Sequence, residues 1–241
     1  MTMQVNNRAS ALILALGIFF GLAALGYFLA DAAIKFKQFD RSVTVKGLSE
    51  REVKADIVIW PIEFTVADNN LESLYQTIDT NTAKIKAFLE KNSISHNEIS
   101  FSTPAINDKT AQQYGGGPAP KYRYSAVQIV TVYSKNIDAV RSVMGSLSEL
   151  GKQGIVFSGG GYQYQTEYLF TRLNEVKPEM IEEATRKARE VAEKFASDSQ
   201  STLGKIKKAS QGQFSINARD KNNPHIKKIR VVSTVQYYLS D

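Results

Sequence analysis

Side chains that act as bases, nucleophiles or metal ligands are few in this chain. It has two histidines, His96 and His225, and no cysteine. Neither histidine has neighbours in the spacing of a metal site or of a Ser/His/Asp triad, so we expect both to be exposed polar residues. The lack of cysteine excludes thiol nucleophiles, disulfides and Cys-ligated metal centres. We therefore predict no catalytic residues, no metal, no cofactor and no enzymatic activity.

Two glycine-rich stretches raise the question of a phosphate-binding loop. They are YGGGPAP at 114–120 and SGGGYQY at 158–164. A phosphate-binding loop ends in Gly-Lys-Ser/Thr and leads into a helix, and neither stretch does so. The first is typical of a polar loop. The second is typical of a bulge or sharp bend in a strand, with a closely approaching ligand as the alternative.

Positive charge gathers near the C-terminus of a chain whose net charge is +6 and whose sequence pI is about 9.3. Such a balance favours acidic partners, for example anionic lipid or a polyanionic polymer. Aromatic residues are not interleaved with the basic ones in a stacking pattern, so nucleic acid is not expected. A solvated surface is the alternative to a binding patch. The candidate anionic-partner patch, expected on one hairpin, consists of Lys205, Lys207, Lys208, Lys227, Lys228 and Arg230.

The N-terminal region contains the sequence ALILALGIFFGLAALGYFLA at 11–30, inside an uncharged run over 9–30. This run is long enough to cross a hydrocarbon core of about 30 Å as a helix, whereas a secretory signal has an apolar core of about 7–15 residues. We predict a retained transmembrane helix over 9–30. A cleaved signal sequence and a buried soluble helix are the alternatives. Gly17 and Gly21 form a G-x-x-x-G pattern that favours helix–helix packing in a membrane.

Around the transmembrane helix we expect an N-terminal tail at 1–8, a connector at 31–41 and an α+β domain at 42–241, with helices on a mostly antiparallel sheet. An approximate strand–helix–strand–strand repeat covers 53–134 and 155–239. The hydrophobic pattern predicts strands at 42–50, 53–66, 98–106, 122–134, 205–216 and 227–239, a strand pair or one strongly bulged strand at 155–170, and helices at 71–91, 136–150 and 177–200.

Two local expectations are specific enough to test. The apolar phase of the second strand shifts at Trp60-Pro61, which predicts a β-bulge there. The helix over 177–200 is expected to begin close to Pro178, because proline is tolerated in a first turn. Its expected buried stripe is Met180, Ala184, Ala188, Val191 and Phe195.

The chain resembles the SIMPL-domain family over about 42–239. The resemblance is carried by VTVKGLSEREVKADIVIWPIEF, NTAKIKAFLEKNSISHNEISF, YRYSAVQIVTV, EATRKAREVAEKFASDSQSTLGKIKKASQGQFSI and VVSTVQYYL, in this order. Its individual features are Gly47 after the first strand, Asp56 at the start of the second, and Leu203-Gly204 before a later strand. The sequence departs from the family pattern near 197–201, where a glycine is usual, so the end of the long helix is less well defined.

The resemblance implies a bacterial envelope protein, exported to the periplasm or held at the membrane. Family members have no assigned biochemical activity, some are associated with stress resistance, and some build ring-shaped homo-oligomers; no catalytic residues carry over. The charges flanking the apolar run slightly favour a cytoplasmic C-terminal side. Because the resemblance implies an envelope protein, we nevertheless expect a single-pass inner-membrane protein with its C-terminal domain in the periplasm.

Taken together, the sequence predicts a membrane-anchored, non-enzymatic envelope protein that self-assembles into a homo-oligomeric ring or scaffold, with a link to stress resistance. Its expected partners are membrane lipid, further copies of itself, and an envelope protein or anionic envelope polymer. Candidate subunit contacts are Tyr162, Tyr164 and Tyr168, because tyrosine offers a large contact area at low entropic cost; a packed strand face is the alternative for each. The alternative function is a periplasmic binding module that captures an anionic envelope ligand through the basic hairpin.

Overall fold

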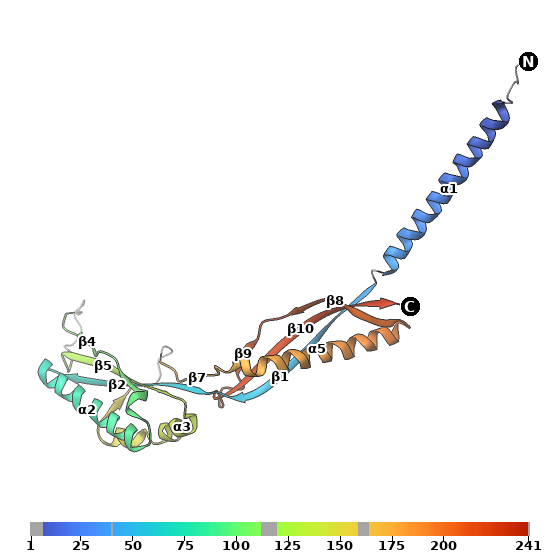
Figure 1. Cartoon of the computed structure of the whole chain (residues 1–241). Helices are drawn as coiled ribbons and strands as arrows, with labels where there is room; N and C mark the ends of the chain where they lie inside the picture. Colours follow the sequence, from blue (N-terminus) through green and yellow to red (C-terminus); the bar gives the residue numbers. More distant parts are fainter. Residues whose placement is uncertain (1–6, 40, 112–119, 159–163, 241) are drawn as a thin grey trace, which may run out of the picture. The chain divides into compact units, whose positions relative to one another are not determined.

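The structure is a computed structural model, which describes residues 7–39, 41–111, 120–158 and 164–240 (Figure 1). The chain divides into two compact units that interleave along the sequence. Unit 1 consists of Met1–Ser49, Pro178–Phe214 and Arg230–Asp241, and unit 2 consists of Glu50–Lys177 and Ser215–Ile229. An N-terminal apolar helix precedes antiparallel sheets and helices, so the predicted α+β class is confirmed.

Helix α1 runs from Asn7 to Phe39. It contains the predicted span at 9–30 and continues through most of the segment expected to be a connector, 31–41. The segment from Asp31 to Phe39 contains no glycine or proline to end the helix. A Lys35–Asp31 ion pair of 2.8 Å, spaced i,i+4, also supports the continued helix.

Unit 1 contains a sheet covered by one helix. Its strands are β1 (Ser42–Lys54, through Ser49), β10 (Ile226–Ser240, from Arg230) and β8 (Thr202–Gln211), in the order β1-β10-β8. Strand β10 pairs antiparallel with β8, from Ser233 opposite Gln211 to Ser240 opposite Thr202. The covering helix is α5 (Leu173–Asp198), of which unit 1 contains the part from Pro178.

Helix α5 differs from its prediction at both its start and its buried face. It begins at Leu173, so Pro178 lies inside the helix and not in its first turn. Its buried stripe is Met180, Ala184, Ala188, Ala192 and Ala196. Val191 is 38% exposed and Phe195 is 55% exposed, so both were wrongly placed in the core.

The alanine stripe has a steric cause in strand β1. A Cβ atom added to Gly47 would lie 1.8 Å from the carbonyl oxygen of Ala184 and 2.5 Å from the backbone nitrogen of Ala188. The helix backbone therefore lies directly on the strand, and only small side chains fit between them. Val45, Val235 and Tyr237 complete this core with Ala188 and Ala192.

Unit 2 is built on a six-stranded sheet in the order β3-β5-β2-β6, with β4 on β5 and β7 on β2. The strands are β2 (Ile57–Asp68), β3 (Ile99–Phe101), β4 (Ala105–Asp108), β5 (Tyr124–Ser134), β6 (Val156–Phe157) and β7 (Glu167–Leu169). Strand β9 (Ser215–Ala218) pairs with β10. The helical segments are α2 (Leu71–Lys91), the 3-10 turn η1 (His96–Glu98), α3 (Ile137–Gly145) and α4 (Ser148–Lys152).

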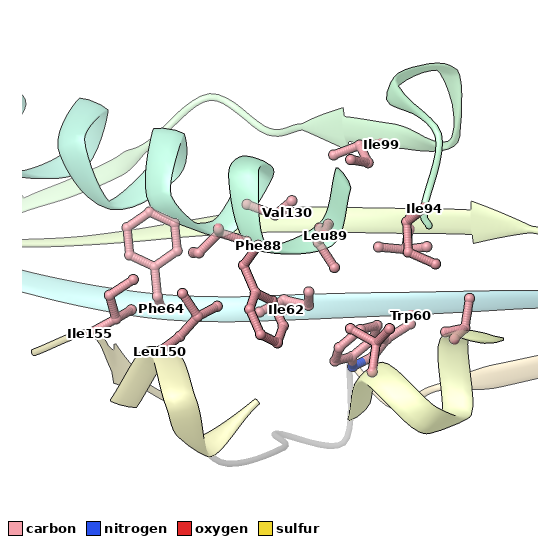
Figure 2. Packing of buried hydrophobic residues seen from close by; sticks show 14 of the residues in the cluster. Trp60, Ile62, Phe64, Phe88, Leu89, Ile94, Ile99, Val130, Leu150 and Ile155 are labelled. Atoms are coloured by element: carbon pink, nitrogen blue, oxygen red, sulfur yellow. The ribbon is translucent and has the colours of Figure 1, made fainter. Parts of the chain in front are cut away.

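The core of unit 2 lies between this sheet and its helices. Ile62 and Phe64 of β2 lie close to Phe88 of α2 and Leu150 of α4, and Trp60 and Leu89 belong to the same core (Figure 2). Helix α2 begins and ends as predicted. Its cap is Asn70, whose side chain accepts a hydrogen bond of 3.1 Å from the Ser73 backbone nitrogen.

The bulge expected at Trp60-Pro61 is absent from the ladder between β2 and β5. The register runs without a shift from Val58 opposite Ser134 to Asp68 opposite Tyr124, and Pro61 lies opposite Thr131. The apparent change of phase comes from apolar residues on both faces of β2: Val58 and Trp60 are already buried in the same phase as Ile62, whereas Ile59 is half-buried on the other face. On the other side of β2, strand β7 pairs with residues 57–59 and β6 with 64–65. Pro61 therefore lies beside the gap between these two short strands, where a missing N–H group costs little.

Candidate functional site

Helix α1 presents an apolar surface around its whole circumference. The large apolar side chains from Leu12 to Ile34 are between 46% and 71% exposed. The stretch Ser10–Lys35 is long and apolar enough to cross a membrane, a test that an N-terminal signal sequence also passes. A Cβ atom added to Gly17 or Gly21 would meet no atom within 4 Å. The two predicted packing glycines are thus open for contact with another helix.

The sheet of unit 1 has two edges, formed by β1 and β8, beside which the described residues place no further strand. The backbone nitrogen of Leu239, near the end of β10, donates to the carbonyl oxygen of Arg41, just before β1. Strand β1 is therefore antiparallel to β10. Since β8 is also antiparallel to β10, β1 and β8 run in the same direction. Open edges carry unpaired backbone groups and can accept a strand from another chain.

Helix α5 lies over β1 and β10, and one side of it borders the β1 edge. The Ser49 hydroxyl of β1 donates to Glu183 Oε2 at 2.7 Å. Lys187, Val191 and Phe195 follow Glu183 at intervals of four residues, so they share its side of the helix. We call Glu183, Lys187, Val191 and Phe195 the overhang row. Its last two members are apolar and exposed.

The six predicted basic residues are divided between the two units. Lys205, Lys207 and Lys208 lie on β8 in unit 1, whereas Lys227 and Lys228 belong to unit 2. Lys208 is opposite Gln236, and Arg230 precedes Gln236 by six residues on β10, a distance of about 20 Å along a strand. Within unit 1, the structure thus separates Arg230 from the three β8 lysines.

Some of these cations already have specific neighbours. Lys228 Nζ lies 2.9 Å from Glu50 Oε2. Lys207 Nζ lies 5.3 Å from the ring centre of Tyr238, which is cation–π distance. Burial lowers the pKa of Lys227, and the charge of Glu167 opposes this shift.

The three tyrosines proposed as subunit contacts have different surroundings. Tyr162 lies outside the described residues, as do most of the two glycine-rich stretches. Tyr164 is 40% exposed and has surface to offer a partner. Tyr168 is buried in the core of unit 2, and burial raises the pKa of its hydroxyl. For Tyr168 the structure shows the alternative, a packed strand face, so it has little surface for a subunit contact.

Asp56 joins two loops at one end of the unit 2 sheet. Its carboxylate accepts hydrogen bonds from the Thr171 backbone nitrogen at 3.0 Å, the Thr171 hydroxyl at 3.1 Å and Arg172 Nε at 3.4 Å. The hollow beside it, of about 540 Å³, is also lined by Lys54 and Lys135. Asp138 lies 3.7 Å from Lys54, so part of the positive charge in this hollow is already balanced. The arrangement holds the loops together and offers a ligand little net charge.

His225 was expected to be exposed, but it is buried in unit 2 at 7% exposure. Its apolar surroundings include the ring of Tyr168, 6.0 Å away between centres. Arg141 Nη1 lies 3.1 Å from His225 Nε2; because arginine only donates, Nε2 accepts and the proton lies on Nδ1. Nδ1 is buried and has no hydrogen-bond partner in the described part of the chain. His96, by contrast, has a 69% exposed side chain, as predicted.

We expect the His225 site to make unit 2 less stable in mild acid. Burial lowers the pKa of His225 below its ordinary 6.5; Arg141, Arg219 and Lys54 act in the same direction, and Asp138 opposes them. The unfolded chain therefore takes up the proton first as the pH falls, so the stabilisation present above pH 6.5 is lost between 6.5 and the lower folded pKa. The urea midpoint of the wild type should fall between pH 7.5 and 5 by more than that of His225→Gln, whose amide oxygen can still accept from Arg141. Parallel pH dependences would contradict this assignment.

No group of three or more His, Asp or Glu side chains suited to a metal ion occurs among the residues that the structure describes. The two features of functional interest are therefore surfaces: the apolar helix α1, and the open-edged sheet of unit 1 with its overhang row.

In the part of the chain that the structure describes, these features define one helix long and apolar enough to cross a membrane and an α+β region with antiparallel sheets. The model of the SIMPL family, described as a protein of unknown function (DUF541), matches residues 43–236. This match covers most of the chain, and the protein belongs to the SIMPL family. A search of curated proteins found no match.

Proposed function

We propose that this protein is a membrane-anchored, non-enzymatic subunit of a homo-oligomeric ring or scaffold in the bacterial periplasm. One observation carries the proposal: a helix of membrane length is followed, after a single residue, by Arg41 and the open edge strand β1. The apolar surface of α1 favours lipid as its surroundings, and the two open edges favour additional strands.

The mechanism of such an assembly is mechanical. Each copy contributes one anchor, so an assembly of many copies is held at the membrane by avidity even where each contact is weak. Two different edges on one sheet allow head-to-tail contacts, which close into rings when the rotation between neighbours permits it. The family match and the apolar N-terminal helix support an envelope location, and the resemblance supports a role in stress resistance.

The first test is the particle mass of the full chain in mild detergent. One chain has a mass of 26.8 kDa, and we expect discrete particles at a fixed multiple of this value after correction for bound detergent. In cells, the protein should remain in the membrane pellet after carbonate washing, and its C-terminal domain should be digested by protease added to spheroplasts. Monomers at all concentrations would refute the assembly, a carbonate-soluble protein would refute the anchor, and protection in spheroplasts would refute the orientation.

A second candidate is a module that binds an anionic envelope polymer through the three lysines of β8. Two of these lysines, Lys205 and Lys208, are exposed, which favours this function specifically. Binding of a polyanion such as heparin should then weaken with salt and be lost in the variant Lys205→Glu/Lys208→Glu. The matched control is Lys84→Glu/Lys91→Glu on α2. Equal polyanion binding by both variants would rule out this candidate.

A further inference from the structure

We infer that copies of this chain associate head to tail, with the β1 edge of one copy beside the β8 edge of the next and the two strands parallel. In this arrangement, Val191 and Phe195 of the first copy cover Ile206 of the second. The inference rests on the proposed self-assembly and adds the interface, its polarity and the residues that form it.

Strand direction supplies the first argument. Within one copy β1 and β8 run the same way, so placing copies side by side in one orientation makes β1 and the neighbouring β8 parallel. Pairing two β1 edges or two β8 edges about a two-fold axis would instead make the joined strands antiparallel. Head-to-tail association is thus the arrangement in which every copy keeps the same orientation.

The membrane anchor gives a reason to prefer equal orientation. Three Cα–Cα steps separate Phe39 at the end of α1 from Ser42 at the start of β1, which limits their distance to about 11 Å. The end of each anchor therefore stays near the start of its own β1. Equal orientation puts these starts at the same end of the joined sheet, so all anchors enter one membrane. Antiparallel pairing about a two-fold axis would place them at opposite ends.

The apolar surfaces at the two edges are complementary. Eight of the ten residues of β8 are exposed, and Ile206 among them is 49% exposed. Ile206 lies opposite Tyr237, which packs against α5, so both side chains point to the helix side of the sheet. At the other edge, the overhang row presents Val191 and Phe195 beside β1. Apolar side chains thus lie exposed on the same side of the sheet at both of its edges.

These two surfaces also lie at the same level along the strands. Tyr237 packs against Ala188 and Ala192, and Val191 belongs to the same turn of α5. A neighbouring β8 placed beside β1 without a shift along the strand therefore brings Ile206 beneath the overhang row. The backbone groups of both edges would then gain hydrogen-bond partners while the apolar side chains leave water.

Cross-linking of the full chain in mild detergent tests the polarity directly. The protein has no cysteine, so introduced thiols are the only ones present. We expect Val191→Cys/Ile206→Cys to give a ladder of multimers with a short bis-maleimide, while each single variant stays uncross-linked. Dimers from Ile206→Cys alone would show pairing of two β8 edges, and dimers from Val191→Cys alone would show pairing of two helix rows. Either result overturns the inference and leaves the proposed self-assembly standing.

Charge substitution provides the second test. Phe195→Glu should raise the concentration at which assemblies dissociate by at least about tenfold, because an unpaired carboxylate would be buried against Ile206. Phe195 is exposed in the single chain, so the fold should persist, which far-UV circular dichroism checks. The matched control is Tyr75→Glu, an exposed aromatic residue on α2 of unit 2, which should leave assembly unchanged. If the wild type assembles and Phe195→Glu assembles equally well, the interface is refuted; if the wild type is monomeric, the proposed function fails instead.

Discussion

Gly47→Ala is expected to destabilise unit 1 by about 3 kcal/mol, the upper range for overpacking a filled core. The added methyl group would lie 1.8 Å from the Ala184 carbonyl oxygen and 2.5 Å from the Ala188 nitrogen. Both are backbone atoms of a helix, so no side chain can rotate away to make room. Either α5 moves off β1, or the strand bends, and in both cases the core formed by Val45, Val235 and Tyr237 loses contacts.

Amide hydrogen exchange followed by mass spectrometry measures this effect locally. Faster exchange is expected in α5 and in the part of β10 that pairs with β8, together with a lower melting temperature. Gly145→Ala is the control, because a Cβ there would meet no atom within 4 Å. If the amides of α5 and β10 exchanged in Gly47→Ala at the wild-type rate, α5 would not pack against β1 as it does in the structure. The same variant should also lose assembly, because the overhang row belongs to the displaced helix.

The elements that the sequence predicts well are those whose signals are local. Helix α2 combines a regular apolar face with a cap at Asn70, and both its ends were predicted correctly. The strand expected at 122–134 was also found, as β5, which lies inside the sheet of unit 2. In such segments, the spacing of a few neighbouring residues is enough to determine the structure.

The elements predicted poorly are those that depend on distant partners. The α5 stripe was expected to include Val191 and Phe195, because larger apolar residues normally mark the core. The actual stripe contains Ala192 and Ala196. Gly47, which lies more than 130 residues earlier in the chain, has no side chain and so permits the helix backbone to lie directly on the strand. The burial of His225 likewise depends on Arg141 and Tyr168, which lie far away in the sequence.

The wrong prediction of the α5 stripe bears on the proposed interface between copies. A helix that uses alanines for packing can expose larger apolar residues on its side, and α5 exposes Val191 and Phe195 in this way. The tyrosines chosen from composition alone gave a weaker signal, since Tyr168 turned out to be a core residue. The interface proposed above instead uses Val191 and Phe195, each of which directly precedes a buried alanine, Ala192 or Ala196.

Phe64→Ala is expected to destabilise unit 2 by about 3–5 kcal/mol, as is usual for removing a fully buried phenylalanine ring. Phe64 is 0% exposed and lies on β2 near Leu150 and Ile155 (Figure 2). Trp60, the single tryptophan of the chain, is in the same core, so its fluorescence during urea unfolding reports on this unit. The midpoint of that transition should fall markedly. In the control Phe101→Ala, which removes a 39% exposed ring, it should change little.

Phe64→Ala, compared with Gly47→Ala and Phe195→Glu, also separates stability from assembly. The proposed interface consists of residues of unit 1, so Phe64→Ala should assemble like the wild type under conditions in which its Trp60 fluorescence is still that of the folded state. Gly47→Ala and Phe195→Glu should instead reduce particle mass. Loss of assembly in folded Phe64→Ala, equal to the loss in Phe195→Glu, would show that unit 2 contributes to the interface and that the edges of the unit 1 sheet are not sufficient for it.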